Sequence, residues 1–412
     1  MVFRNQTGWF TFALILGLGL AGTSSSPAAN YNIFSGQSIQ SKINAATNGD
    51  TITIYAGLYS ENLTISGKDV RLLRPASQAV TLSGNITFSG ITNAYTFGGF
   101  TIGGMTDKTL TISNCPKMSV YAVTMAAGNV SVTGSNTTAD FARCTITGNI
   151  TVASSVQRMS LARSTVTESL DTSANETLVA YSTLRWFRQR STGKAILVGN
   201  TLNERLVDGG KTVEVYDSAA LIALNNIVRD GAYYGYNDNF AFWISGGASL
   251  NAFNNVIFNY SGRYADRGFH FEPNRSSVSE ISSNIGHTIQ DEFLYGSFNY
   301  INALYNLSST GAGGGVYLTS HISADPAFID TTNFVLGASS PARDAGNPDP
   351  RFNDIDGTRN DMGIYGGPFY DPDGRSGSKP VVLKAELDNT QFVKGDLSSV
   401  KLKAAGAATG SP

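Results

Sequence analysis

Apolar and polar residues recur in one short pattern along most of this chain. In each occurrence a small or amide residue follows a short strand-like segment and precedes an apolar run. The central residues of ten such segments are Gly99, Ala122, Cys144, Ser164, Ser182, Asn200, Asn226, Asn255, Asn284 and Asn306. The segments are rich in Val, Ile, Thr and aromatic residues, and Gly, Asn, Ser and Asp bound them. The pattern therefore predicts short β-strands.

The spacing of these segments, about 18 to 29 residues, indicates a repeat architecture. Such a period is typical of a solenoid, in which each repeat buries its apolar face only against its neighbours. The segments between the strands contain no amphipathic helix of useful length, which excludes helical and leucine-rich repeats. We therefore expect an all-β protein whose β-helix repeats span residues 83–323, a single-stranded, right-handed, parallel β-helix of about ten or eleven coils.

The first coils follow a short amphipathic segment. Ile39 and Ile43 lie four residues apart behind Ser38, a good N-cap residue, which predicts a short helix. We expect residues 30–82 to form an N-terminal cap with the first coils, because an open solenoid end exposes strand edges and apolar core. The stretch IQSKINAATNGDTITIYAGLYSENLTI resembles the start of secreted right-handed β-helix proteins, the architecture of pectate lyases and pectinesterases.

A second resemblance lies near the C-terminus. Residues 324–370 depart from the repeat and carry DP-x-F, SPA-x-D-x-G and NDxDGxRNDxGxYG in order. This segment closely resembles the C-terminal part of a large group of bacterial secreted parallel β-helix repeat proteins. The resemblance implies a pectate-lyase-like architecture and a secreted protein, and we expect the segment to form a C-terminal cap.

Asparagine fills the repeat position in the later coils, from Asn200 to Asn306. Stacked asparagines in one turn can hydrogen-bond both the backbone and each other, which stabilises identical tight turns. The alternative is a row of ligand-binding amides. We favour the structural ladder, because these residues flank buried apolar positions.

The N-terminus and the composition indicate a protein that acts outside the cytoplasm. Residues 1–29 combine Arg4, an apolar run and a small-residue stretch, the pattern of a cleaved signal peptide; the run is too short for a transmembrane helix. Only 15% of residues are charged and the net charge is −2, which argues against nucleic acid. Two cysteines are too few for a disulfide framework, and we expect Cys115 and Cys144 to be buried free thiols.

Beyond the cap we expect a linker at residues 371–380 and a β-strand tail at 381–412. The tail contains two alternating segments, VVLKAEL and SVKLKAA, which resemble the opening of an immunoglobulin-like module. So short a tail cannot bury a core of its own. Either the module is incomplete, or the strands dock on a protein partner or on the solenoid.

The longest repeats, between Asn226 and Asn284, contain two insertions rich in aromatic and charged residues. Solenoids accept insertions on their turns, and these gather on the binding face. Aromatic rings cover the apolar faces of sugars, and arginine pairs with uronate carboxylates. The predicted substrate-binding residues are Arg229, Tyr233, Tyr234, Tyr236, Trp243, Tyr264 and Arg275. The alternative is that these aromatics wall a long loop onto the solenoid.

The same region holds candidate catalytic residues. A lyase on a uronic polysaccharide needs a cation that neutralises the carboxylate, for which Arg263 and Arg267 are candidates, and a base that removes the α-proton. For the base we consider His270, Tyr264 and Arg275. Strand alternation places Phe269 and Phe271 on one face and His270 and Glu272 on the other. If the phenylalanines face the core, His270 and Glu272 are solvent-facing neighbours, and they form either an acid–base pair or an ordinary solvated surface pair. A glycoside hydrolase needs paired carboxylates instead, available from Asp238, Asp266, Glu272, Asp291 and Glu292.

Asp354, Asp356 and Asp361 form an acidic run in the C-terminal cap that invites calcium as a cofactor. The run fails the EF-hand template, and pairing with Arg343 or Arg359 explains the residues equally well. The preferred function is engagement of extracellular polysaccharide through the long-loop face, with lyase activity on an acidic polymer as the catalytic hypothesis. The alternative is a non-catalytic adhesive or structural surface protein.

Overall fold

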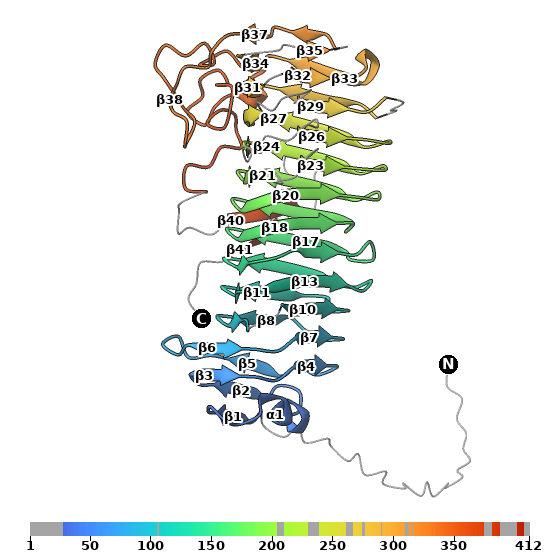
Figure 1. The fold of residues 1–412 in the computed structure, drawn as a ribbon, viewed down its shortest axis with the longest axis vertical. Helices are drawn as coiled ribbons and strands as arrows, with labels where there is room; N and C mark the ends of the chain where they lie inside the picture. Colours follow the sequence, from blue (N-terminus) through green and yellow to red (C-terminus); the bar gives the residue numbers. More distant parts are fainter. Residues whose placement is uncertain are drawn as a thin grey trace, which may run out of the picture.

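The chain forms a parallel β-solenoid of about eleven turns in this computed structural model (Figure 1). The structure describes residues 28–104, 107–203, 210–229, 239–260, 267–273, 277–289, 291–309, 313–314, 316–374, 381–387 and 402–407. Within these residues, no helix combines the length and apolar character needed to cross a membrane.

One side of the solenoid is an eleven-stranded parallel sheet, here called the back sheet. Each of its strands contributes one rung of the coil, and the rungs pair in register along the long axis (Figure 1). Its strands are β8 (Tyr95–Gly98), β11 (Met118–Tyr121), β14 (Thr138–Ala142), β17 (Arg158–Ala162), β19 (Glu176–Ala180), β21 (Lys194–Val198), β24 (Ala220–Leu224), β27 (Ser249–Phe253), β30 (Ser279–Ser282), β33 (Ile301–Leu304) and β36 (Leu318–Thr319).

After a tight turn, each coil continues into a second run of paired strands, here called ladder 1. Ladder 1 contains β3 (Gly57–Tyr59), β6 (Val80–Leu82), β9 (Thr101–Ile102), β12 (Thr124–Met125), β15 (Thr145–Ile146), β18 (Thr165–Thr172), β20 (Thr183–Gln189), β22 (Thr201–Asn203), β25 (Ile227–Arg229), β28 (Val256–Tyr260), β31 (Ile285–Ile289), β34 (Leu307–Ser308) and β37 (Ile322–Ser323). The chain then enters ladder 2, which leads back to the next strand of the back sheet.

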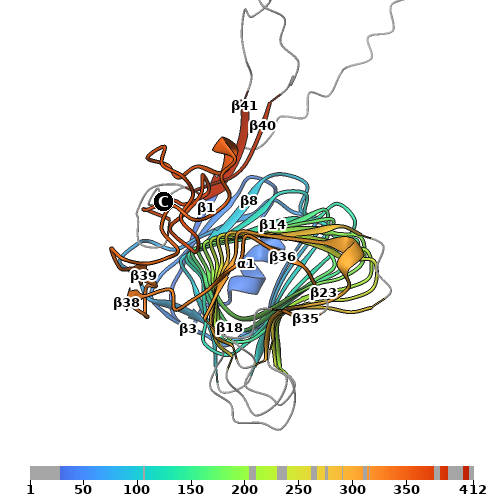
Figure 2. The same cartoon turned by 90° about the horizontal axis from the view of Figure 1, so that it is seen from above.

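Ladder 2 contains β4 (Leu63–Ser66), β7 (Ile86–Ser89), β10 (Lys108–Ser113), β13 (Gly128–Thr133), β16 (Ile150–Val152), β23 (Lys211–Val215), β26 (Phe240–Ile244), β29 (Arg267–Phe271), β32 (Glu292–Tyr295) and β35 (Gly313–Gly314). The long strands β18 and β20 belong to both ladders and join them into one sheet. Seen along the axis in Figure 2, the strands enclose a narrow interior. Alternate side chains fill it: Phe242 and Phe269 stack inward with ring centroids 4.8 Å apart.

The N-terminal segment contains the predicted helix. Helix α1 (Ile39–Ala45) begins after Ser38, whose side chain accepts a hydrogen bond from the Ser41 backbone N–H, and it buries Ile39 and Ile43. The Glu61 carboxylate accepts hydrogen bonds from the N–H groups of Ile39 and Gln40, an arrangement that stabilises a helix N-terminus. The helix lies at the N-terminal end of the solenoid, beside a small sheet of β1 (Asn30–Ile33), β2 (Thr51–Ile54) and β5 (Arg71–Leu73) (Figure 1).

The asparagine ladder lies in the tight turn between the back sheet and ladder 1. Asn255 is typical: its side-chain oxygen accepts from the Asn226 backbone N–H, and its amide donates to the Asn284 side-chain oxygen, both at 2.9 Å. All five asparagines are buried. The structural interpretation is therefore confirmed, and these amides are occupied by protein partners.

In the earlier coils, two predicted members of this column are wrong by one residue. Strand pairing aligns Thr101, Thr124 and Thr145, so the residues stacked below Cys144 are Val123 and Phe100. Gly99 and Ala122 occupy the preceding left-handed position, with φ of 78° and 50°. A period known only to within a residue cannot separate these two adjacent turn positions. Cys144 and Cys115 are free and buried, and burial raises the pKa of both thiols.

Residues 324–374, here called the strap, return along the tight-turn edge of the solenoid. The strap contains the antiparallel pair β38 (Phe328–Asp330) and β39 (Val335–Leu336) and a short 3-10 helix, Pro350–Phe352. The strap forms hydrogen bonds with residues at the left-handed turn position of successive coils. The Asn347 N–H donates to the Ser283 side chain. Further down the solenoid, side chains of the coils donate to the strap: Asn254 to Asn360, Asn225 to Ile364 and Arg163 to Gly374. The strap thus lies along the side of several coils, whereas the sequence predicted a cap.

Two strands follow the strap. β40 (Val381–Leu387) and β41 (Leu402–Ala407) pair antiparallel as a hairpin. Figures 1 and 2 draw this hairpin on the back-sheet side of the solenoid, level with its middle coils.

Candidate functional site

Three rings stack on the outward face of ladder 2. Trp243, His270 and Tyr295 occupy equivalent positions of β26, β29 and β32. The ring centroids are 4.5 Å apart between Trp243 and His270, and 5.1 Å apart between His270 and Tyr295, with nearly parallel planes. Because neighbouring rings cover one another's faces, contact with a ligand falls mainly to their edges. These residues are here called the ring column.

A second outward row packs against the ring column. It contains Lys211, Phe240 and Arg267, which pair across β23, β26 and β29. The Lys211 amine lies 3.6 Å from the centroid of the Trp243 ring, and the Arg267 guanidinium lies 4.2 Å from that of Tyr295. Cations over aromatic faces are held by the ring quadrupole. The two rows together form a packed array of rings and cations along the solenoid axis, in which Phe240 and His270 are buried.

The cations on this face differ in their ionic partners. Arg267 forms ion pairs with Asp291 at 3.3 Å and with Glu292 at 2.7 Å. Lys211 has no carboxylate within ion-pair distance among the described residues. Burial lowers the pKa of the Lys211 amine, which Glu214 and Glu272 partly oppose. Lys211 is therefore the cation of this surface that is best available to an anionic ligand.

Below Trp243, the outward column continues in β23 with Glu214, whose carboxylate has protein partners. Glu214 is buried and accepts a hydrogen bond from the Arg188 guanidinium at 2.8 Å and another from the Tyr216 hydroxyl. Arg188 also contacts Asp171 at 3.2 Å. A buried carboxylate with two donors is a structural element, so Lys211 is the residue of β23 that we assign to the candidate site, which extends from β23 to β32.

His270 is more enclosed than the sequence indicates. Its neighbours Phe269 and Phe271 do face the core, but only 9% of the His270 side chain is exposed, because Trp243 and Tyr295 cover both ring faces. The expectation of a solvent-facing histidine is therefore wrong. Burial lowers the pKa of His270 to about 4, assisted by Arg267 and Lys211, so the imidazole is neutral at neutral pH.

The two ring nitrogens of His270 face opposite partners. Nδ1 lies 3.3 Å from the Arg267 guanidinium, and Nε2 lies 3.9 Å from the carboxylate of Glu272, whose side chain is 33% exposed. Because the guanidinium can only donate, this contact favours the tautomer that carries its proton on Nε2. The predicted His270–Glu272 neighbours do lie together, and Glu272 is the more accessible of the two.

The structure brings together four of the predicted site residues: Trp243, Arg267, His270 and Glu272. Arg229 lies elsewhere, on ladder 1, where it donates a hydrogen bond to the Thr332 carbonyl oxygen and covers the Phe334 ring of the strap. The other predicted residues lie outside the described residues: Tyr233, Tyr234, Tyr236, Arg263, Tyr264 and Arg275. The strands that flank the two insertions do pair in adjacent coils, as predicted.

Sequence reasoning missed Lys211, Phe240 and Tyr295. Lys211 lies outside the long repeats between Asn226 and Asn284, and it contacts Trp243 only because β23 pairs with β26. Aligning the ladder 2 strands on their buried alternate residues would have revealed all three, since Val213, Phe242, Phe269 and Leu294 form one inward column. Asp291 and Glu292, considered as hydrolase carboxylates, are the ionic partners of Arg267.

The predicted metal residues lie in the strap and bind backbone amides. Asp354 accepts from the N–H groups of Asp361 and Gly367, Asp361 accepts from Asp344, and Asp356 accepts from Thr358. In the part of the chain that the structure describes, no three His, Cys, Asp or Glu side chains form a cluster suited to a metal ion. The geometry thus gives these carboxylates a role in the turns of the strap, and calcium binding stays a prediction.

Asp354 makes stability depend on pH. Burial raises its pKa from the ordinary value of 3.8 to about 6, and the neighbouring charge of Asp361 adds to this. Between about pH 4 and 6 the folded protein holds a proton that the unfolded chain has released, so stability falls as pH rises through this window. We expect Asp354→Asn to flatten that fall in melting temperatures measured from pH 4 to 7. An equally steep fall in the variant would assign the effect to another group.

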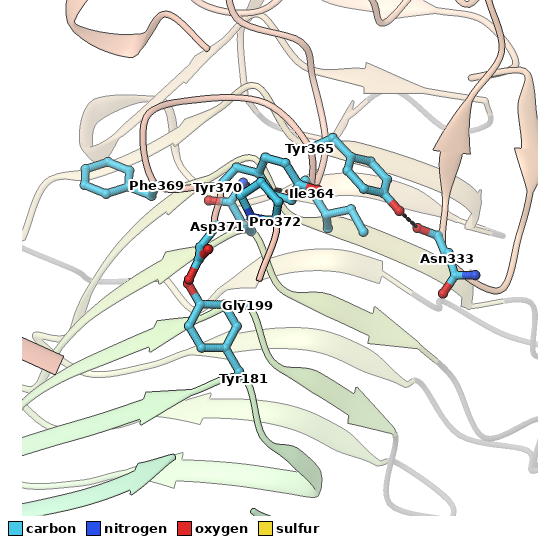
Figure 3. A pocket seen from close by; sticks show the side chains of 10 residues that line it. Tyr181, Gly199, Asn333, Ile364, Tyr365, Phe369, Tyr370, Asp371 and Pro372 are labelled. Carbon is cyan, nitrogen blue, oxygen red and sulfur yellow. Dashed lines mark hydrogen bonds between the residues drawn. The ribbon is translucent and has the colours of Figure 1, made fainter. Parts of the chain in front are cut away.

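A hollow of about 210 Å³ lies between the strap and the solenoid (Figure 3). Rings of the strap and Tyr181 of the solenoid surround it, and Figure 3 shows Tyr181 pointing toward Asp371. Its polar groups already have partners: the Tyr365 hydroxyl donates to the Asn333 carbonyl oxygen, and the Asn225 amide donates to the strap. We attribute the hollow to imperfect packing of the strap against the coils.

The fold class, a parallel β-solenoid, follows from the strand pairing alone. No known protein family matches the chain. No curated protein matches it either. Among solved structures, the crystal structure of pectate lyase Pel9A is similar at 14% sequence identity with a TM-score of 0.43, over 83% of this chain and 97% of that one.

Proposed function

We propose that this chain is a secreted protein that binds an acidic polysaccharide along the outward face of ladder 2, from β23 to β32. The observation that carries the proposal is the Lys211 amine, held over Trp243 with no ion pair in the described structure, beside the ring column. The signal-peptide pattern of residues 1–29 supports secretion. Those first residues lie almost entirely outside the described part of the chain.

The chemistry of this face suits a linear polymer of uronic acids. An ammonium without an ionic partner can pair with a uronate carboxylate, and the partly exposed Glu272 carboxylate can accept hydrogen bonds from sugar hydroxyls. The ring column repeats along the solenoid axis at the spacing of the coils, so successive sugars can meet equivalent edges. The stacked faces of Trp243 and His270 make face-on sugar stacking the less suitable mode.

Lys211→Met tests the binding proposal. It keeps an unbranched chain over Trp243 but removes the charge, and we expect roughly tenfold weaker binding to polygalacturonate, equivalent to about 1.4 kcal/mol. Binding measured by calorimetry should also lose part of its salt dependence. Lys117→Met, at an exposed turn lysine, is the matched control and should leave affinity unchanged. Equal affinity in both variants and the native protein would refute the proposed contact.

The catalytic hypothesis, β-elimination, is tested on the same protein. Lys211 and Arg267 would neutralise the substrate carboxylate, and His270 would take the α-proton on Nδ1 once Arg267 releases that nitrogen. The glycosidic C–O bond at the β-carbon would break as the double bond forms, and water would protonate the leaving oxygen. We expect an increase in ultraviolet absorbance from unsaturated ends, abolished by His270→Gln with binding retained. A flat trace with retained binding would favour the second candidate, a non-catalytic adhesive or structural protein. The enclosure of His270 and its pKa of about 4 favour that candidate, because so weak a base removes a carbon-bound proton poorly.

A further inference from the structure

One outward column of the back sheet changes from polar to apolar and back again. Strand pairing aligns its members in the order Ser119, Asp140, Ser160, Leu178, Ile196, Ile222, Asn251, Glu280 and Asn302. The apolar members lie in three consecutive strands, β19, β21 and β24. Outward positions of a sheet that faces water are normally polar, so an apolar interruption confined to three coils indicates a covered surface.

The lower part of this surface is buried although it faces outward. Leu178 is 7% exposed, and its outward neighbours Ala162 and Ala180 are also buried. Other residues of the same strands, such as Leu161 and Val179, face the core, so the core does not explain the burial of Leu178. Ile222, at the upper edge of the apolar stretch, is 37% exposed. The burial is therefore local and centred on β17 and β19, which requires a covering segment there.

The path of the strap identifies that segment. Arg163, directly after β17, donates hydrogen bonds to the carbonyl oxygens of Asp373 and Gly374. A side chain at Gly374 would overlap the Tyr181 ring, so the strap ends in close contact with the turns that follow β17 and β19. Residues 375–380 separate this anchor from β40, and six residues span at most about 20 Å. The hairpin is thus tethered beside the buried surface.

The hairpin itself needs a surface to pack on. β40 and β41 pair with each other and with no other described strand, and an isolated two-stranded hairpin is marginal in water. Along both segments apolar residues alternate with charged ones. Figures 1 and 2 draw the hairpin on the back-sheet side, at the level of these coils. We propose that β40 and β41 dock on the outward face of β17, β19 and β21, so that this chain is its own partner.

Limited proteolysis of the full-length protein tests the docking. Leu178→Asp places a charge in the covered surface, and we expect trypsin to cut the tail lysines at least tenfold faster with an unchanged melting temperature of the solenoid. Ser119→Asp, in the same column but outside the apolar stretch, is the matched control and should cut at the native rate. Leu387→Asp, within the hairpin, should release the tail without touching the solenoid.

Three results would overturn the proposal. The first is a native tail cut as fast as a free peptide of the same sequence. The second is a native cutting rate in both Leu178→Asp and Leu387→Asp. The third is a dimer in sedimentation that becomes a monomer when residues 375–412 are removed, which would assign the hairpin to a second copy. Removal of that tail from a monomer should instead increase binding of a hydrophobic dye to the exposed surface.

Discussion

Asn255→Ala should lower the free energy of unfolding by roughly 3 to 5 kcal/mol. The Asn255 amide donates to the carbonyl oxygen of Ala223 and to the Asn284 side chain, and its oxygen accepts two hydrogen bonds from Asn226. The Asn284 oxygen keeps the Asn255 backbone N–H and the Asn226 side-chain amide keeps the Leu197 carbonyl oxygen. The buried Asn226 backbone N–H and the Ala223 carbonyl oxygen lose these hydrogen bonds without gaining water, at about 1 to 3 kcal/mol for each unsatisfied group. Alanine also leaves a small void. Urea unfolding followed by circular dichroism measures the loss.

Asn251→Ala is the control for the ladder. Asn251 lies in the neighbouring strand β27 and is exposed, and its side chain accepts one hydrogen bond, from the Glu280 backbone N–H. We expect a loss of no more than about 1 kcal/mol there. Similar losses at both positions would mean that the stacked amides contribute no more than surface contacts. Because neighbouring coils are coupled, the ladder variant should also broaden the unfolding transition.

Gly366→Ala should detach the lower part of the strap. A Cβ at this position would overlap the Asp361 carbonyl oxygen and crowd the Asn254 amide, neither of which can yield, since both hold the strap against the coils. The clash involves backbone, so the segment must move. We expect hydrogen exchange of residues 360–367 to accelerate by at least a hundredfold, while exchange in the strands of the solenoid stays slow.

Gly357→Ala is the matched control within the same strap. Gly357, unlike Gly366, adopts a positive φ, 87°, and its Cβ would meet open space. We expect a cost of about 1 kcal/mol from the backbone conformation and no detachment. If this variant released the strap as readily as Gly366→Ala, the close approach at Gly366 would not be what holds the strap in place.

The solenoid could be predicted because its signal is local and repeated. Each coil places β-forming residues before and after a turn, and the asparagines from Asn200 onward mark the same turn in successive coils. The prediction was wrong by one residue at Gly99 and Ala122, where two adjacent turn positions accept small residues equally well. Alternation within β29 also predicted that Phe269 and Phe271 share one face, and the structure shows that this face is the core.

The sequence predicted several residues of the candidate site but not their electrostatic state. The chemistry of their side chains predicts four site residues that the structure places together: Trp243, Arg267, His270 and Glu272. Their electrostatic state could not be predicted, because it depends on neighbours from other coils. Lys211 comes from the coil below Trp243, and Asp291 and Glu292 come from the coil above Arg267. The enclosure of His270 likewise results from the rings of two neighbouring coils.

The amino-acid sequence alone determined the repeat, the strand character of its segments and the column of turn asparagines, because these depend on alternation and turn chemistry within a few residues. Only the tertiary structure decided which cation is left without an ionic partner and how far burial lowers the pKa of His270. It also decided where the strap lies and which apolar surface is covered. These properties depend on contacts between residues that are tens to hundreds of positions apart, and such contacts exist only once the coils are stacked in register.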